Sequence, residues 1–376
     1  MATGRKFVNV QVLRLVAALL VVGTHATLYT SERLRPGDVW HFGEVGVDLF
    51  FVISGFVMMT SSWRHLHEPG YGRVFLLRRL VRIGPMYWIA TTMNLVLLAV
   101  LPSLVPERPS ALRVLLSYLF VSTRSPTGRM EPLHGVGWTL VFEMAFYLVF
   151  AVALALRANV LLVCVVVFTA CTAGGLLRPD RFTSPAWVYL DPVVLYFVAG
   201  LVIGRWVCDR ATRPALLWMA YLLVVWTLNA LLRSGGDAFA WHLLLRPVLV
   251  TVVVVAVVLL EPLTRTRVPA PLVLLGDASY SLYLFHPFIG PVVVVVLARL
   301  GLGVPWVSVA LVLLASVVGS AVLYAVVERP LTRALQRWTP GLRPHPQATS
   351  EGAPLALTGV GTRASRRASR RFDEPG

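Results

Sequence analysis

The chain has 376 residues, of which 57% are hydrophobic and only 14% are charged, and its mean hydropathy is +0.74. Soluble globular domains are about 45–50% apolar and about 25% charged, so this composition excludes one. It also excludes disorder for most of the chain, because disordered segments are polar and highly charged. The formal net charge is +16, but the chain has too little polar surface for a nucleic acid partner. The composition predicts a polytopic membrane protein.

About ten stretches are apolar and long enough to cross a bilayer, whose core of about 30 Å needs roughly 20 apolar residues per helix. The predicted spans are residues 8–28, 46–62, 83–104, 136–155, 160–177, 186–203, 214–232, 241–260, 278–297 and 304–326. The predicted fold class is therefore all-α, a polytopic integral membrane protein whose membrane domain covers residues 1–338. Residues 339–376 are rich in Pro, Ser, Gly and Arg and predict a disordered cytoplasmic tail.

Loop charges predict the orientation of these spans. Lys and Arg are more frequent in the loops on the side of the N-terminus than in the opposite loops, which predicts cytoplasmic N- and C-termini. The first span is expected to remain uncleaved, because Arg14 interrupts it and no signal-peptide cleavage site follows. The three cysteines, Cys164, Cys171 and Cys208, lie in or beside apolar spans without ligand-like spacing. Neither a disulfide framework nor a metal site is predicted.

Ionisable residues inside spans are costly to bury, so each is a candidate for a functional site. Arg14 and His25 lie eleven residues apart in the first span. That separation is almost three whole turns, which places both on one face about 16 Å apart. A buried neutral histidine can act as a general base near pH 7. Alternatively, His25 hydrogen-bonds a neighbouring helix and Arg14 extends to the membrane surface; the pair alone leaves both interpretations open.

Two carboxylates lie at a depth similar to that of His25. Asp48, near the outer end of the second span, either orients the imidazole of His25 or caps the helix N-terminus. Glu143 lies about two turns into the fourth span, with Trp138 and Tyr147 near it on the helix. It belongs either to a site or to a structural pair with an arginine of another span. The shared depth of the three titratable groups favours a site.

An arginine cluster follows the second span and is predicted to lie at the inner membrane face, at Arg78, Arg79 and Arg82. Arg79 and Arg82 are three residues apart and hence neighbours on a helix. Two guanidinium groups suit a phosphate-bearing ligand. The positive-inside rule explains the charge equally well, and charge alone favours that simpler explanation.

The ninth span is unusually polar on one face, where Ser279, Tyr280, Ser281, Tyr283 and His286 occur together. Such a helix either lines a cavity or packs against its neighbours through hydrogen bonds. The last span ends with Glu328 and Arg329, which are expected to pair or to lie at the membrane interface.

Together these stretches resemble the membrane acyltransferase-3 family from about residue 10 to residue 333. The resemblance rests on six motifs in order: Arg14 with ten residues before His25, then GVDLFFVISGF, RRLVRIGPMYW, GVGWTLVFEMAFY, GDASYSLYLFHP and VERP. The fourth and fifth motifs look most similar to those of exopolysaccharide-production acetyltransferases. Two features depart from the commoner form. The segment before Arg14 reads Val-Gln-Val-Leu, and no extracytoplasmic hydrolase domain follows, so acceptor handling is expected in the membrane unit or in a partner.

The resemblance implies an O-acyltransferase of the bacterial inner membrane that moves an acyl group, often acetyl, from cytoplasmic acyl-CoA to a sugar hydroxyl. It implies that His25 is the catalytic histidine and Arg14 its paired arginine, and that Arg79 and Arg82 form the family's R-x-x-R pair. Acyl-CoA is then a cosubstrate, and no cofactor is expected to be bound permanently. The predicted site comprises catalytic His25, Glu143 and Asp48, donor-binding Arg14, Arg79 and Arg82, and substrate-binding Trp138, Tyr147, Tyr280 and His286.

Two other functions are compatible with the sequence. A transporter or flippase for a lipid-linked saccharide would also have about ten spans and intramembrane charges, but repeated halves with interrupted helices, which transporters often have, are not found. An acyltransferase acting on a glycosylated small metabolite is the third interpretation. The expected partners are acyl-CoA, a saccharide or glycosylated acceptor and the lipid bilayer, with a homo-oligomer or glycan-assembly partners left open.

Overall fold

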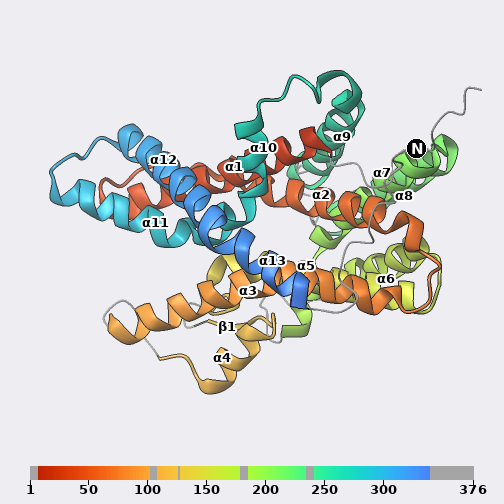
Figure 1. The fold of residues 1–376 in the computed structure, drawn as a ribbon, viewed down its shortest axis with the longest axis horizontal. Coiled ribbons are helices and arrows are strands. Elements are labelled where there is room, and N and C mark those ends of the chain that lie inside the picture. Colours follow the sequence, from red (N-terminus) through yellow and green to blue (C-terminus); the bar gives the residue numbers. More distant parts are fainter. Residues whose placement is uncertain (1–6, 102–107, 126–127, 178–184, 234–240, 339–376) are drawn as a thin grey trace, which may run out of the picture. The chain divides into compact units, whose positions relative to one another are not determined.

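A computed structural model describes residues 7–101, 108–125, 128–177, 185–233 and 241–338 (Figure 1). These residues are helical almost throughout, and ten of their helices are long and apolar enough to cross a membrane. The prediction of an all-α, multi-pass membrane protein is therefore confirmed. The predicted disordered tail, residues 339–376, lies outside the described residues.

The elements follow one another as a series of long helices joined by short connections. In chain order they are α1 (Val8–Arg33), α2 (Val45–Ser62), α3 (Tyr71–Val100), α4 (Ala111–Tyr118), β1 (Thr123–Arg124), β2 (Met130–Glu131), α5 (Trp138–Ala155), α6 (Val160–Gly174), α7 (Leu195–Asp209), α8 (Thr212–Arg233), α9 (Trp241–Thr264), α10 (Ala270–Asp277), α11 (Ser279–Arg299), α12 (Pro305–Leu323) and α13 (Arg329–Trp338). The two short strands pair antiparallel, and a π-helical turn, Tyr324–Glu328, joins α12 to α13.

The third spanning helix begins earlier than predicted. It starts at Tyr71, directly after Gly70, whose φ of 76° ends the preceding turn. Arg79 and Arg82 therefore lie inside α3, twelve residues of which precede the predicted start of the span at residue 83. Arginine is a good helix former, so the helix continues through the charged residues, whereas hydropathy marks only the apolar part.

A carboxylate from α9 fixes the start of α1. The N-cap residue of α1, Phe7, makes no side-chain cap. Instead, the backbone N–H groups of Val8 and Asn9 donate to the two carboxylate oxygens of the buried Glu261, each at 2.8 Å. The first N–H groups of a helix lack internal partners and favour a negative charge. Glu261 thereby ties α1, which carries Arg14 and His25, to α9.

Helices α2 and α7 pack backbone against backbone through glycines. A Cβ atom at Gly55 would lie 2.1 Å from the carbonyl oxygen of Phe197, and one at Gly200 would lie 2.0 Å from that of Val52. Small residues allow such close approach between membrane helices. The contact holds α2, which contributes side chains to both cavities described below.

Replacing Gly200 by leucine is expected to destabilise the fold by about 3 kcal/mol, because the larger side chain must push the two backbones apart. The measurement is the apparent unfolding temperature of the purified protein. Gly303→Leu is the matched control, since no heavy atom lies within 4 Å of a Cβ atom at Gly303. An equal loss of stability in both variants would contradict the packing described for α2 and α7.

Candidate active site

One cavity, of about 90 Å³, lies among α1, α2, α3, α5 and α11. The structure brings together six of the predicted site residues in its lining: Arg14, Arg79, Arg82, Glu143, Tyr147 and Tyr280. We call this space the arginine cavity. Its remaining walls are mostly apolar side chains of α2, so the charged groups lie together in a small, largely apolar space.

Three guanidinium groups converge on the arginine cavity. Arg14 of α1 lies in electrostatic range of Arg82 of α3. Arg79, also on α3, lies in electrostatic range of Arg82 as well. Arg79 donates from Nη2 to the Ser61 hydroxyl at 3.1 Å, and its guanidinium lies 5.5 Å from the ring centroid of Phe75. Its Nε is buried and has no hydrogen-bond partner among the described residues. A buried donor without a partner is unfavourable, and an anionic ligand in the cavity would satisfy it.

Glu143 is held by two hydroxyl groups. Its Oε1 accepts a hydrogen bond from Ser54 of α2 at 3.0 Å and another from Tyr147, one turn further along α5. It lies in electrostatic range of Arg14 and Arg79. The carboxylate therefore faces the cavity as a partial counter-charge while the hydroxyls fix its orientation.

Glu328 is a second carboxylate of this site, and the sequence interpretation missed its role. Its side chain is buried and accepts a hydrogen bond from the Ser281 hydroxyl at 2.5 Å. It lies in electrostatic range of Arg82 and Arg14. The expected pair with Arg329 is not found among the described residues: Glu328, at the end of the π-helical turn, is buried, whereas Arg329 is exposed. π-Turns inside helices are frequent at functional sites, and Ser281 on the polar face of the ninth span was the available signal.

His25 and His286 form a pair of imidazoles. Their ring centroids are 4.8 Å apart and the rings meet edge to face. Nδ1 of His25 donates to the Val21 carbonyl at 3.0 Å, and Nδ1 of His286 donates to the Tyr283 carbonyl at 2.8 Å. A carbonyl only accepts, so each neutral ring carries its proton on Nδ1 and a lone pair on Nε2. Nε2 of the buried His286 has no partner among the described residues. The pair therefore presents two proton acceptors side by side.

The histidine pair adjoins the arginine cavity but does not line it. Tyr283 connects the two, since it lines the cavity and its ring centroid lies 6.1 Å from that of His286. The Tyr283 hydroxyl is fixed by donating to the Val136 carbonyl and accepting from Thr139, both at 2.9 Å. Along α1, His25 lies about 16 Å beyond Arg14. The arginines and the proton acceptors thus lie about three helical turns apart along α1, with Tyr283 close to both.

Asp48 does not belong to this region. It accepts a hydrogen bond from Nε of Arg246 and another from the Tyr196 hydroxyl, and no contact with His25 is found among the described residues. The N-cap position of α2 belongs to Glu44. Both predicted roles of Asp48, orienting His25 and capping α2, are therefore wrong; the Val21 carbonyl orients His25. Asp48 and Trp138 instead line a second cleft, of about 700 Å³.

His134, which the sequence interpretation did not single out, lies one residue before the fourth spanning helix. Its Nε2 donates to the Leu284 carbonyl at 2.9 Å, and its ring stacks on Phe288. Burial lowers the pKa of His134 from 6.5 to about 4. Between pH 4 and pH 6.5, His134 is therefore protonated to a smaller extent in the folded protein than in the unfolded chain.

This pKa predicts a loss of stability in acid. The contribution of neutral His134 to the free energy of unfolding is complete above pH 6.5 and is lost as the pH falls toward 4. The total loss is about 3 kcal/mol. We expect the apparent unfolding temperature to fall more steeply between pH 7.5 and pH 5 in the native protein than in His134→Gln, whose amide keeps a donor for Leu284. The same pH dependence in both proteins would contradict this assignment.

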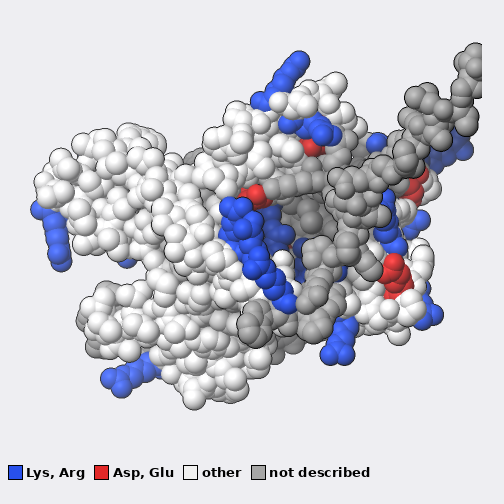
Figure 2. All heavy atoms as spheres, viewed as in Figure 1, with Lys and Arg blue, Asp and Glu red and all other residues white. Residues whose placement is uncertain are grey.

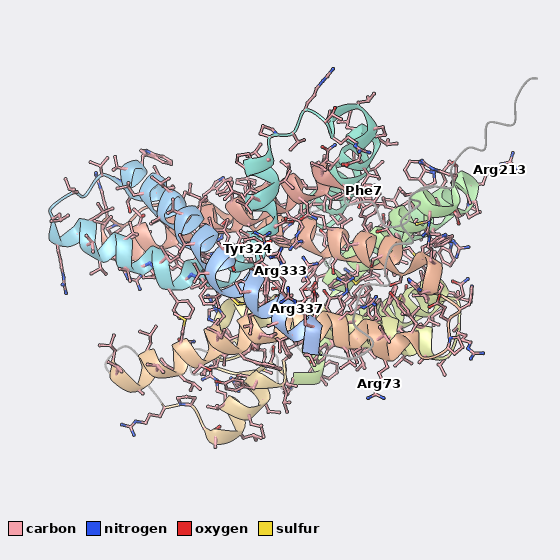
Figure 3. The ribbon with its side chains drawn as sticks, viewed as in Figure 1. Phe7, Arg73, Arg213, Tyr324, Arg333 and Arg337 are labelled. Atoms are coloured by element: carbon pink, nitrogen blue, oxygen red, sulfur yellow. The ribbon has the colours of Figure 1, made fainter. Side chains whose placement is uncertain are left out.

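Further basic side chains lie near the arginine cavity. Figure 2 shows basic side chains along a hollow in the middle of one face, and Figure 3 places Arg333 and Arg337 of α13 beside it, whereas Arg73 and Arg213 lie at the periphery. Arg329, Arg333 and Arg337 follow one another at four-residue spacing, which places them on one face of the helix. Tyr324, just before α13, lies in electrostatic range of Arg82. The arginines of α13 therefore extend the basic lining beyond the cavity.

Comparison with known proteins identifies the family of the chain. The acyltransferase domain of the acyltransferase-3 family matches residues 7–325, which include the histidine pair and the three cavity arginines. The chain is 37% identical over 314 residues to the exopolysaccharide production protein ExoZ of Rhizobium meliloti (strain 1021), a match that covers 82% of this chain and 96% of that protein. No solved structure matches the chain significantly. The chain belongs to the acyltransferase-3 family and is a membrane acyltransferase.

Proposed function

We propose that the protein is an O-acyltransferase that moves an acetyl group from cytoplasmic acetyl-CoA to a hydroxyl group of a saccharide during exopolysaccharide production. The observation that carries the proposal is the arrangement of side chains along α1: Arg14 lines the arginine cavity, and His25, further along the same helix, uses Nδ1 to bond the Val21 carbonyl and so carries a lone pair on Nε2. The name of the relative from Rhizobium meliloti supports the choice of acceptor.

The basic end of this region suits the phosphate groups of the donor. Arg79 and Arg82 would hold the pyrophosphate, with the buried Nε of Arg79 finding its missing partner there. The exposed arginines of α13 would contact the outer phosphate of the nucleotide. Arg14 would then lie beside the pantetheine arm, which extends along α1 toward His25.

The reaction we propose is direct transfer. Nε2 of His25 takes the proton of the acceptor hydroxyl while that oxygen attacks the thioester carbonyl carbon. The tetrahedral intermediate collapses, the carbon–sulfur bond breaks, and the leaving thiolate takes the proton back from His25. The Val21 carbonyl holds the reactive tautomer, and His286 offers a second nitrogen for the proton.

The proposed orientation places both termini in the cytoplasm of a bacterium whose inner membrane holds the protein. Ten spans bring the two ends of the chain to the same side, and the positive-inside rule assigns that side to the cytoplasm. The arginines of α3 and α13 then face the compartment that supplies acyl-CoA, and His25 lies toward the outside.

The test uses purified protein in lipid nanodiscs, where no transmembrane gradient exists. We expect the protein to bind labelled acetyl-CoA and to transfer the label to a saccharide when lipid-linked oligosaccharides are supplied. A transporter would do neither without a gradient. Label found only on a small glycosylated metabolite would reject the saccharide acceptor, and absence of both binding and transfer would reject the function.

A further inference from the structure

The second cleft, of about 700 Å³, is separate from the arginine cavity and opens where α2, α5 and α9 begin. Asp48 lies in the first turn of α2, Trp138 is the first residue of α5, and Arg246 lies in the second turn of α9. The end of α8 contributes Trp226 and Asn229. Residues far apart in the sequence thus form one concave surface at a single end of the bundle.

Aromatic rings form much of the wall of this cleft. Trp138 and Phe142 follow one another at four-residue spacing along α5, with ring centroids 5.8 Å apart. Tyr196 and Trp226, which also line the cleft, have ring centroids 5.7 Å apart. Aromatic rings next to polar groups suit a ligand that has apolar ring faces and hydroxyl groups around them.

The polar groups of the cleft carry both signs of charge. The carboxylate of Asp48 and the guanidinium of Arg246 neutralise each other at its floor. The side chain of Arg246 remains 34% exposed whereas that of Asp48 is only 6% exposed, so the arginine presents its other N–H groups to the cleft. Arg129, Glu131 and Asp191 complete the rim. Such a mixture does not select a polyanion such as a nucleotide, and it is too polar for a lipid chain.

We propose that this cleft binds sugar units of a neutral saccharide acceptor, adjacent to the unit that receives the acyl group. The inference rests on the proposed acyl transfer and adds the place where the acceptor is held. Sugar rings would stack on Trp138, and their hydroxyl groups would accept from Arg246 and donate to Asp191 and Glu131.

Helix α5 connects this cleft to the reacting groups. Trp138 faces the cleft, and the next residue, Thr139, donates its hydroxyl hydrogen to Tyr283 beside the histidine pair. Phe142, also in the cleft, contacts Phe51 of the arginine cavity, with ring centroids 6.2 Å apart. A saccharide held in the cleft therefore lies one helix away from the region of acyl transfer.

The test is calorimetric titration of the protein in nanodiscs with three neutral oligosaccharides: cellotetraose, laminaritetraose and maltotetraose. At least one is expected to bind. Trp138→Ala and Arg246→Gln should each weaken that binding about tenfold. The matched control is Trp306→Ala, because Trp306 is 79% exposed on α12 and should leave binding unchanged. Trp138→Ala leaves the Asp48–Arg246 pair intact, so it remains informative if Arg246→Gln fails to fold.

Two outcomes would overturn the cleft assignment: no oligosaccharide binds the native protein, or binding is equally strong in Trp138→Ala. Acetyl-CoA binding, measured in the same samples, separates this result from the proposed function. Acetyl-CoA bound without any oligosaccharide would reject the cleft alone, whereas bound oligosaccharide without acyl transfer would reject the enzymatic function alone.

Discussion

Replacement of His25 by alanine is expected to lower the rate of acyl transfer about 10³-fold, the range typical for loss of a general base, while acetyl-CoA still binds. The reason is that Nε2 of His25 is the proton acceptor at the end of the region that begins at the arginine cavity. The measurement is transfer of labelled acetyl from acetyl-CoA by purified protein under single-turnover conditions. The side chain is only partly buried and bonds to its own helix, so the variant is expected to fold.

His67→Ala is the matched control, because His67 is exposed in the connection before α3. It should transfer acetyl at the native rate. Transfer by His25→Ala at a rate close to that of the control, with equal amounts of folded protein, would remove His25 from the mechanism. A comparable loss in His286→Ala alone would move the role of base to His286.

Replacement of Arg79 and Arg82 together by glutamine is expected to raise the dissociation constant of acetyl-CoA about 100-fold. Hydrogen bonds to charged groups contribute about 1.5–3 kcal/mol each, and both guanidinium groups line the cavity that we assign to the donor. Equilibrium binding of labelled acetyl-CoA to the purified protein measures the effect. Transfer at saturating donor should fall far less than binding.

Arg78→Gln provides the control for this pair. Arg78 precedes Arg79 on α3 but does not line the arginine cavity. Its replacement removes one positive charge from the same helix, as each single replacement of the pair does. An equal loss of affinity in Arg78→Gln would mean that general positive charge attracts the donor. Unchanged affinity in the double variant would contradict the phosphate-binding role.

The pattern of apolar residues predicted most of the fold, because each span must satisfy its own backbone within the bilayer. The start of α3 was misplaced since a helix also continues through Arg79 and Arg82, which hydropathy counts as polar. Arg14, Arg79 and Arg82 were expected to lie together, and all three line the arginine cavity. Glu143 was instead expected beside His25, because both were placed at a similar depth, but it lines the arginine cavity with Arg14.

Contacts between distant spans were not predictable in this way. The pairing of Arg246 with Asp48 depends on how α9 packs against α2. The inward direction of Glu328 depends on a π-turn that has no simple sequence signature. In both cases the sequence predicts how deep the residue lies in the membrane. It does not predict which neighbouring helix the side chain faces, because that depends on packing.

The most direct test of the account is a cryo-electron microscopy structure of the protein in nanodiscs with a non-hydrolysable acetyl-CoA analogue. We predict that the pyrophosphate lies within hydrogen-bonding distance of Arg79 and Arg82, and that the acetyl group lies beside His25. A donor bound elsewhere, or an acetyl group remote from His25 while the nucleotide occupies the arginine cavity, would contradict the account.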